Sequence, residues 1–261
     1  MSLLRAEWTK FWSVRGTRWG IILVVVLTVG LTAFFAAVGG TDATEAGQGD
    51  DDVVVNSLRG VYLGQLAVIT LGAVVGTSEY ATGLIRTTFA AVPRRRRVLA
   101  AKAAVLGMAM AASGLLASFA SFLVSQPLLQ SNGYVAPAYP PPSLATEPVL
   151  RAVIGTGAFL TLLALLSLGV GMILRRAGAA ISIMVALTLV PLIAAEPGSP
   201  LMPETVAVWV RRTTPIAGMA IQQTRERLDT AIGPWAGLAV LCGWTVAALL
   251  AAGWLLKRRD A

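Results

Sequence analysis

Long apolar segments alternate with shorter polar ones along the whole chain of 261 residues. A helix that crosses a bilayer needs about 20 mostly apolar residues. Six segments have about this length, and we expect spanning helices over residues 19–38, 60–77, 103–123, 152–174, 177–195 and 235–256. Each must be helical, because hydrocarbon cannot satisfy an open backbone and the alternation of β-barrel strands is absent. The pattern predicts an all-α membrane protein whose single domain, residues 1–261, has six transmembrane helices.

The composition agrees with a lipid environment and removes several kinds of chemistry. Charged residues make up 13% of the chain and hydrophobic residues 56%, whereas soluble domains have about 25% charged residues. The chain has no histidine, which excludes the commonest metal ligand and general base. The single cysteine, Cys242, lies in an apolar run and has no partner for a disulfide. We therefore expect no catalytic residue, no metal site and no cofactor within this chain.

The distribution of charge predicts the orientation of the helices. Most of the 21 Lys and Arg residues lie before the first span, between spans two and three, between spans four and five, and after the last span. The alternate loops hold most of the acidic residues. By the positive-inside rule both termini are cytoplasmic, which fits a multi-pass protein of the plasma membrane. The net charge of +8 is thus explained by topology, and we expect no nucleic-acid partner.

The arm formed by residues 1–18 predicts an amphipathic helix in the headgroup layer of the bilayer. The side chains on its apolar side are Leu4, Trp8, Phe11, Trp12 and Trp19. The side chains on its polar side are Arg5, Thr9, Lys10, Ser13 and Thr17. Tryptophan opposite basic residues is typical of interfacial helices, although Glu7, Arg15 and Arg18 fall near the apolar side. A simple basic anchor before the first span explains the arm equally well.

Three segments are predicted on the outer side. Residues 39–57 are rich in Gly, Asp and Thr and predict a solvated, flexible loop. The prolines at 137 and 140–142 predict an extended connection. Residues 196–233 mix apolar and charged side chains, and Pro203 and Pro215 can each begin a short helix. These helices would lie on or dip into the outer leaflet, and a folded surface loop is an equal alternative.

The cytoplasmic loop between spans two and three, residues 79–102, has the most distinctive sequence. Residues 82–91 can form a short amphipathic helix with Leu84, Ile85 and Phe89 on its apolar side. Pro93 ends that helix, and four arginines at 94–97 follow as a basic collar. A positive-inside turn accounts for the arginines. It leaves unexplained why Glu79, a carboxylate, stands at the end of an apolar helix, where a charge is costly unless it is paired or functional.

The loop resembles that of the ABC-2 type transporter permeases, and especially the bacterial, actinobacterial-like branch. The shared pattern is Glu-x-x-x-Gly-[Thr/Leu]-[Ile/Leu]-Arg, then about ten residues, Pro-x-[Ser/Arg]-Arg and a following Lys. The matching positions are Glu79, Gly83, Leu84, Ile85, Arg86, Pro93, Arg97 and Lys102. The order of amphipathic arm, six spans and long segment before the last span also resembles that family. The run of four arginines departs from the usual Ser-Arg pair.

The resemblance implies a transporter built from several chains. The loop after span two would be a coupling helix that docks on a separate ATP-binding subunit, and two permease chains would join two such subunits. The chain has no Gly-x-x-x-x-Gly-Lys-[Ser/Thr] motif, so ATP and magnesium would be bound by that partner. The implied function is movement of a hydrophobic or amphipathic substrate, and the implied direction is outward, because export dominates the family.

Span two carries small residues and one polar group. Gly60, Gly64, Gly72 and Gly76 form a ridge of i, i+4 spacing that allows helices to approach closely. Packing within the chain is the simpler interpretation, and a contact with a second permease is the alternative. Gln65 is expected to bond to a neighbouring helix or to contact substrate.

Three other functions are compatible with parts of the pattern. A secondary carrier or channel would need no ATPase, but ion-coupled carriers bury ionisable groups at mid-membrane, where this chain has almost none. An intramembrane enzyme would need catalytic groups that the spans lack. A membrane anchor or assembly protein of another complex would show the same sequence features as a permease.

Overall fold

The computed structural model describes residues 3–39, 52–81, 83–84, 95–136, 139–195, 199–225 and 232–258. Six of the helices within these ranges are long and apolar enough to cross a membrane, which confirms the predicted multi-pass architecture. They are α2 (Arg15–Val38), α4 (Val61–Ala81), α6 (Arg95–Ser131), α7 (Glu147–Leu174), α8 (Ala177–Ala194) and α10 (Pro234–Arg258). The shorter helices are α1 (Leu3–Ser13), α3 (Val53–Ser57), α9 (Glu204–Thr213) and the 3₁₀ helix η1 (Pro215–Gln222).

Helix α6 is much longer than the predicted span over residues 103–123, because it contains 37 residues. At 1.5 Å per residue it is about 55 Å long, whereas the hydrocarbon core of a bilayer is about 30 Å thick. The residues added at its start are mainly Arg, Ala, Leu and Lys, which are strong helix formers. Hydropathy marks only the part of a helix that suits lipid, so it could not predict these polar extensions.

Helix α7 lies at the centre of the bundle and packs against α4, α6 and α10. Phe159, Leu160 and Leu163 of α7 are completely or almost completely buried. They belong to one apolar core with Ile69 of α4 and Met110 of α6. The helices around α7 leave large apolar side chains exposed, as a bundle surrounded by lipid requires.

The glycine ridge of α4 packs within the chain, as the simpler interpretation of the sequence held. A Cβ atom added to Gly64 would lie 2.5 Å from Thr28 Oγ1 of α2, and one added to Gly76 would lie 2.8 Å from the backbone oxygen of Leu168 in α7. Residues spaced by four turn about 40° per step around a helix. The ridge therefore faces α2 at one end of α4 and α7 at the other.

Gln65 does not make the expected hydrogen bond between helices. Its side chain is fully buried, and Nε2 donates to the backbone oxygen of Tyr62 at 2.8 Å, within α4 itself. Its Oε1 is buried and has no hydrogen-bond partner among the described residues. The prediction that Gln65 bonds to a neighbouring helix is therefore wrong within the described residues.

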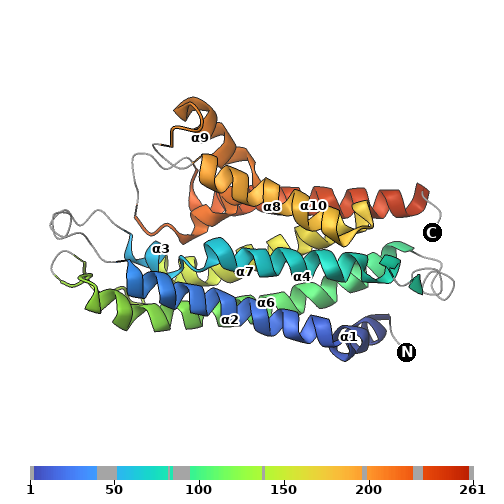
Figure 1. The fold of residues 1–261 in the computed structure, drawn as a ribbon, viewed down its shortest axis with the longest axis horizontal. Coiled ribbons are helices and arrows are strands. Elements are labelled where there is room, and N and C mark those ends of the chain that lie inside the picture. Colours follow the sequence, from blue (N-terminus) through green and yellow to red (C-terminus); the bar gives the residue numbers. More distant parts are fainter. Residues whose placement is uncertain are drawn as a thin grey trace.

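Both ends of the chain lie at the same end of the bundle, which we call the terminal end, and α3 and α9 lie toward the opposite end (Figure 1). An even number of long helices produces this arrangement. At the opposite end, the prediction of a solvated loop over residues 39–57 is wrong for its last part. Residues 53–57 form α3, and Val53 and Val54 are buried, because three successive valines favour burial over solvation. Residues 40–51 lie outside the described residues.

The other two connections at the opposite end differ in their packing. The described residues of the proline-rich connection before α7 contain no helix, and the buried rings of Tyr134 and Tyr139 pack with centroids 5.0 Å apart. Helix α9 follows Pro203, and η1 begins at Pro215. All eight residues of η1 are buried, and η1 packs against α7 and α10. The second predicted short helix is thus a 3₁₀ helix inside the bundle. The alternative prediction of a surface loop is wrong for these residues.

Candidate functional site

Four charged side chains meet at the terminal end of the bundle, and we call them the charge cluster: Glu7, Lys10, Glu79 and Lys102. They come from three helices, because Glu7 and Lys10 lie on α1, Glu79 on α4 and Lys102 on α6. Glu79 and Lys102 were singled out in the loop pattern and Lys10 in the arm. The structure brings the two groups together and adds Glu7.

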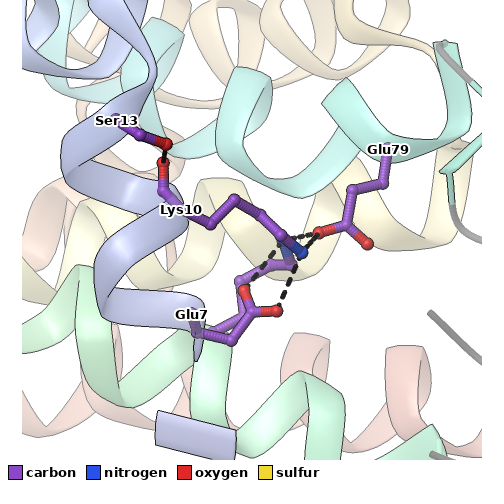
Figure 2. Close-up of polar contacts among 5 residues, drawn as sticks. Glu7, Lys10, Ser13 and Glu79 are labelled. Atoms are coloured by element: carbon purple, nitrogen blue, oxygen red, sulfur yellow. Dashed lines mark hydrogen bonds and ion pairs between the residues drawn. The ribbon is translucent and has the colours of Figure 1, made fainter. Parts of the chain in front are cut away.

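Glu79 is the centre of the charge cluster. Its Oε1 accepts hydrogen bonds from Lys10 Nζ at 2.6 Å and from Lys102 Nζ at 2.7 Å. Figure 2 shows the ammonium of Lys10 between the carboxylates of Glu7 and Glu79. Lys10 Nζ lies 3.0 Å from Glu7 Oε1, and Lys102 Nζ lies 3.4 Å from Glu7 Oε2. Each ammonium thus contacts both carboxylates, and the four formal charges sum to zero.

The charge cluster is mostly withdrawn from solvent. The side chains of Glu7, Glu79 and Lys102 are only 5%, 5% and 6% exposed, while that of Lys10 is 39% exposed. A buried charge is tolerated when opposite charges and hydrogen bonds compensate its lost hydration. The unexplained carboxylate at the end of span two is therefore paired, and its partners hold α1 and α6 against α4.

The pKa of Lys10 is raised above its ordinary value of 10.5. Burial opposes this shift, because it disfavours the charged ammonium and lowers the pKa. The hydrogen bonds and negative charges of Glu79 and Glu7 outweigh burial. Lys10 therefore remains a cation throughout the physiological pH range.

The arm forms helix α1, with Glu7 and Phe11 as its buried residues. Trp8 and Trp12 are exposed, and their rings meet edge to face with centroids 5.8 Å apart. Arg15, at the start of α2, is also exposed. The acidic residue that disturbed the amphipathic pattern thus faces the protein, where it pairs with Lys102.

The predicted coupling segment is described only in part. Gly83 adopts a positive φ of 71°, which ends α4 in a left-handed conformation that suits glycine. Leu84 and Arg97 are exposed, and Arg97 does not join the charge cluster. Four further residues of the predicted coupling segment lie outside the described residues: Ile85, Arg86, Phe89 and Pro93. The predicted helix over residues 82–91 stays a prediction.

A second contact strengthens the terminal end beside the charge cluster. The guanidinium of Arg175, between α7 and α8, lies 5.1 Å from the centroid of the Tyr80 ring. A cation over an aromatic ring stabilises a structure by about 0.5–1 kcal/mol at exposed sites. The contact places the short α7–α8 connection against the residue that follows Glu79.

Asp52 makes a different kind of contact at the opposite end. Its carboxylate accepts hydrogen bonds from the backbone amides of Val54 and Val55 in α3. It also accepts hydrogen bonds from the backbone amides of Thr224 and Arg225 and from the Thr224 hydroxyl, at 2.6–3.2 Å. We call this set of contacts the Asp52 clasp, because it ties α3 to the residues that follow η1.

Arg151 holds the same segment from the other side. Its Nη2 donates to the backbone oxygen of Gln223 at 3.0 Å, and its Nη1 donates to that of Ile221 at 3.4 Å. The Asp52 carboxylate and the Arg151 guanidinium thus bond to backbone amides and carbonyls at the end of η1. At a helix end these backbone groups have no partners within the helix.

Sequence reasoning missed Glu7, Asp52 and Arg151 as members of these sites. Glu7 is the single acid in a basic arm, and Arg151 stands one residue before the apolar run of span four. Such isolated charges beside apolar segments are a usable signal, because they must find partners when the segments pack. Asp52 follows two other acidic residues, so nothing in the sequence distinguishes it.

The described residues contain no group of three or more Cys, Asp or Glu side chains that could hold a metal ion. The contacts within the charge cluster are ion pairs and hydrogen bonds. No known protein-family model matches this sequence, and no curated protein is significantly similar to it.

Proposed function

We propose that this chain is the permease subunit of an ABC-2 type exporter, driven by a separate ATP-binding subunit. The proposal rests on the family resemblance of residues 79–102 and on six helices suited to a membrane. One observation carries it: Glu79, the first residue of the loop pattern, is the centre of a buried charge cluster that joins three helices. That position suits a residue through which movement of the loop reaches the spans.

The charge cluster supplies a physical route for coupling. An ATPase that docks on residues 82–94 would displace the end of α4, next to Gly83. Because Glu79 bonds to Lys10 of α1 and Lys102 of α6, a shift of α4 either carries both helices with it or breaks buried ion pairs. The second alternative is costly, because Glu79 and Lys102 would be separated while both remain buried. Concerted movement is therefore the favoured response.

The proposed topology places both termini in the cytoplasm of a plasma-membrane protein. The positive-inside distribution and the common location of the two termini support it. Helix α1 would lie in the interface with Trp8 and Trp12 toward lipid headgroups, because these rings are exposed. Helix α9 would lie at the outer leaflet, and η1 would enter the bundle from that side.

The working unit would contain two ATPase chains, which bind ATP and magnesium, and a second permease chain. Helices α2 and α8 support this proposal because large apolar side chains on both are exposed, including Phe34 and Val190. Lipid and a second permease would share these surfaces. The mostly apolar spans are compatible with a hydrophobic or amphipathic substrate.

The direct test is purification of the full tagged chain from membranes in mild detergent, with mass spectrometry of the proteins that remain bound. We expect a soluble P-loop ATPase, and we expect Glu79→Ala to weaken its binding or to uncouple ATP hydrolysis from transport. A second variant, Gly83→Ala, strains only the backbone, because nothing lies within 4 Å of the added Cβ. Gly178→Ala is its matched control, since that site is equally open and no positive φ occurs there.

The outcomes separate the candidate functions. Recovery of the chain without an ATPase would favour the ATPase-independent carrier or channel. Recovery with an unrelated membrane complex would favour an anchor or assembly protein. If Glu79→Ala and Gly83→Ala bind and couple an ATPase as well as the Gly178→Ala control does, the coupling role of this loop is refuted.

A further inference from the structure

A groove of about 470 Å³ lies between the first halves of α7 and α10, at the end of the bundle that holds the Asp52 clasp. Its walls are apolar and include Leu150, Ile154 and Ala158 of α7 and Trp235 and Leu238 of α10. Arg151 lines the groove as well. Its volume lies within the range of about 300–1,000 Å³ that is typical of small-molecule sites.

The cation of Arg151 has little compensating negative charge. Its side chain is 11% exposed, and its hydrogen bonds within the described residues go to the neutral carbonyls of Ile221 and Gln223. The carboxylate nearest to it is Glu147, 3.6 Å from Nε, and the Glu147 side chain is 76% exposed. Because water screens the exposed carboxylate of Glu147, it compensates the charge of Arg151 only weakly. The guanidinium is thus fixed in position and has the charge to attract an anion.

The position of the groove suggests where that anion comes from. Helices α7 and α10 are both candidate membrane spans, and Arg151 and Trp235 each lie near the start of their helix. Tryptophan and arginine near the ends of spanning helices mark the level of lipid headgroups. The apolar walls extend from there along both helices, and the exposed side chains of Ile154 and Trp235 lie at the mouth of the groove.

We propose that this groove binds one phospholipid of the surrounding leaflet, with its phosphate on Arg151 and an acyl chain along Ile154, Ala158 and Leu238. The charge of the phosphate complements the guanidinium, and the acyl chain complements the walls. Arg151 also donates to the carbonyls of Ile221 and Gln223, so the bound phosphate would lie beside the end of η1. This inference goes beyond the proposed transport function and does not depend on an ATPase.

The test is native mass spectrometry of the full chain in detergent, titrated with phosphatidylglycerol. Arg151→Gln removes the charge and keeps a hydrogen-bond donor, and Ala158→Phe fills the groove while it retains Arg151. Arg59→Gln is the matched control, because Arg59 is an exposed arginine beside α3 at the same end of the bundle. We expect one phosphatidylglycerol to bind at least about tenfold more weakly to Arg151→Gln than to the wild type, the loss expected for a charge-assisted contact.

Ala158→Phe is expected to lose the same lipid, and Arg59→Gln is expected to retain it. Diacylglycerol with the same acyl chains is expected to bind the wild type at least about tenfold more weakly, because it lacks the phosphate. Equal binding of phosphatidylglycerol by Arg151→Gln, Ala158→Phe and the wild type would overturn the proposal. Equal binding of diacylglycerol, or binding of inorganic phosphate without preference for the lipid, would overturn it too.

Discussion

Buried charges are held differently at the two ends of the bundle. At the terminal end, the carboxylates of Glu7 and Glu79 pair with the ammonium groups of Lys10 and Lys102. At the opposite end, the carboxylate of Asp52 is surrounded by backbone amides and a hydroxyl. Ion pairs between side chains join helices to one another, whereas a carboxylate bound to backbone amides fixes the backbone itself. The difference indicates that α1, α4 and α6 are tied together through side chains at the terminal end, and that backbone segments are held directly at the opposite end.

The largest expected effect comes from removing the centre of the charge cluster. Glu79→Ala leaves Lys10 and Lys102 without their shortest contacts, and Lys102 is almost fully buried. Breaking one side of a buried ion pair costs about 3–5 kcal/mol. We expect a corresponding fall in the unfolding midpoint of the purified protein in detergent.

The double variant Glu79→Gln/Lys102→Met provides the control for that prediction. It removes one charge of each sign, so the remaining pair of Glu7 and Lys10 stays balanced. We expect the loss of stability in the double variant to be smaller than the summed losses of the single variants Glu79→Gln and Lys102→Met, because the two charges interact directly. Additive losses would show that Glu79 and Lys102 do not stabilise each other, and the comparison between the two ends would fail.

A smaller loss is expected for the Asp52 clasp. Asp52→Ala removes the acceptor for the amides of Thr224 and Arg225 and also the cap of α3. Loss of such an acceptor costs about 1–3 kcal/mol, and loss of a helix cap costs about 1 kcal/mol. Hydrogen exchange should show faster exchange at residues 224 and 225, with no change at residues 7–11.

Asp52→Asn tests whether the negative charge matters or only the acceptor. Asparagine retains one carbonyl oxygen, which can still accept from Val54 N and from the Thr224 hydroxyl as Oδ1 does now. The expected exchange rates lie between those of the wild type and Asp52→Ala. If exchange spreads instead to the terminal end, the two ends form one cooperative unit.

Close packing of backbones at the opposite end provides the third prediction. A Cβ atom added to Gly237 of α10 would overlap the backbone oxygen of Ala217 in η1 and lie 2.9 Å from its carbonyl carbon. Overpacking of this kind costs about 1–3 kcal/mol. Gly237→Ala should therefore lower the unfolding midpoint. Gly243→Ala is the matched control on the same helix, since nothing lies within 4 Å of its added Cβ. Equal midpoints for the two variants would show that η1 can move away from α10.

The sequence predicted the six long helices but not the contacts that distinguish the two ends. A span is a local property, because about 20 apolar residues suffice to identify it. The bond between Lys10 and Glu79 joins residues 69 positions apart, and that between Asp52 and Thr224 joins residues 172 positions apart. No local pattern specifies such pairs. An unpaired charge beside an apolar helix signals that a partner exists, as Glu79 did, but the partner is chosen by how the helices pack.

The burial of η1 shows the same limit in another form. Its residues, from Pro215 to Gln222, are mostly apolar and are preceded by a charged amphipathic stretch. A membrane surface or a protein interior would suit them equally by hydropathy. The deciding factor is the small residues opposite η1: Gly155 of α7 and Gly237 of α10 have no room for a Cβ because Ile221 and Ala217 lie against them. Those glycines have a function only in the packed structure.

The smallest expected effect is the pH dependence of the charge cluster through Lys10. Folding raises the pKa of Lys10 above its ordinary value of 10.5. The stabilisation from this lysine is therefore fully present below pH 10.5 and is lost as the pH rises through the pKa of Lys10 in the folded protein. The loss is modest, because Lys10 is partly exposed and solvent screens its contacts.

Hydrogen exchange in residues 7–11, corrected for its intrinsic pH dependence, should lose protection above that pH in the wild type but not in Lys10→Met. Exchange at residues 224 and 225 should follow the same course in both proteins, because the groups that bond to Asp52 in the clasp are backbone amides and a hydroxyl, which do not titrate with lysine. Lys257→Met, which changes an exposed lysine at the end of α10, should match the wild type in both regions. If Lys10→Met also matches the wild type above pH 10.5, the terminal end does not depend on the charge of Lys10, and the contrast with the Asp52 clasp rests on Glu79 and Lys102 alone.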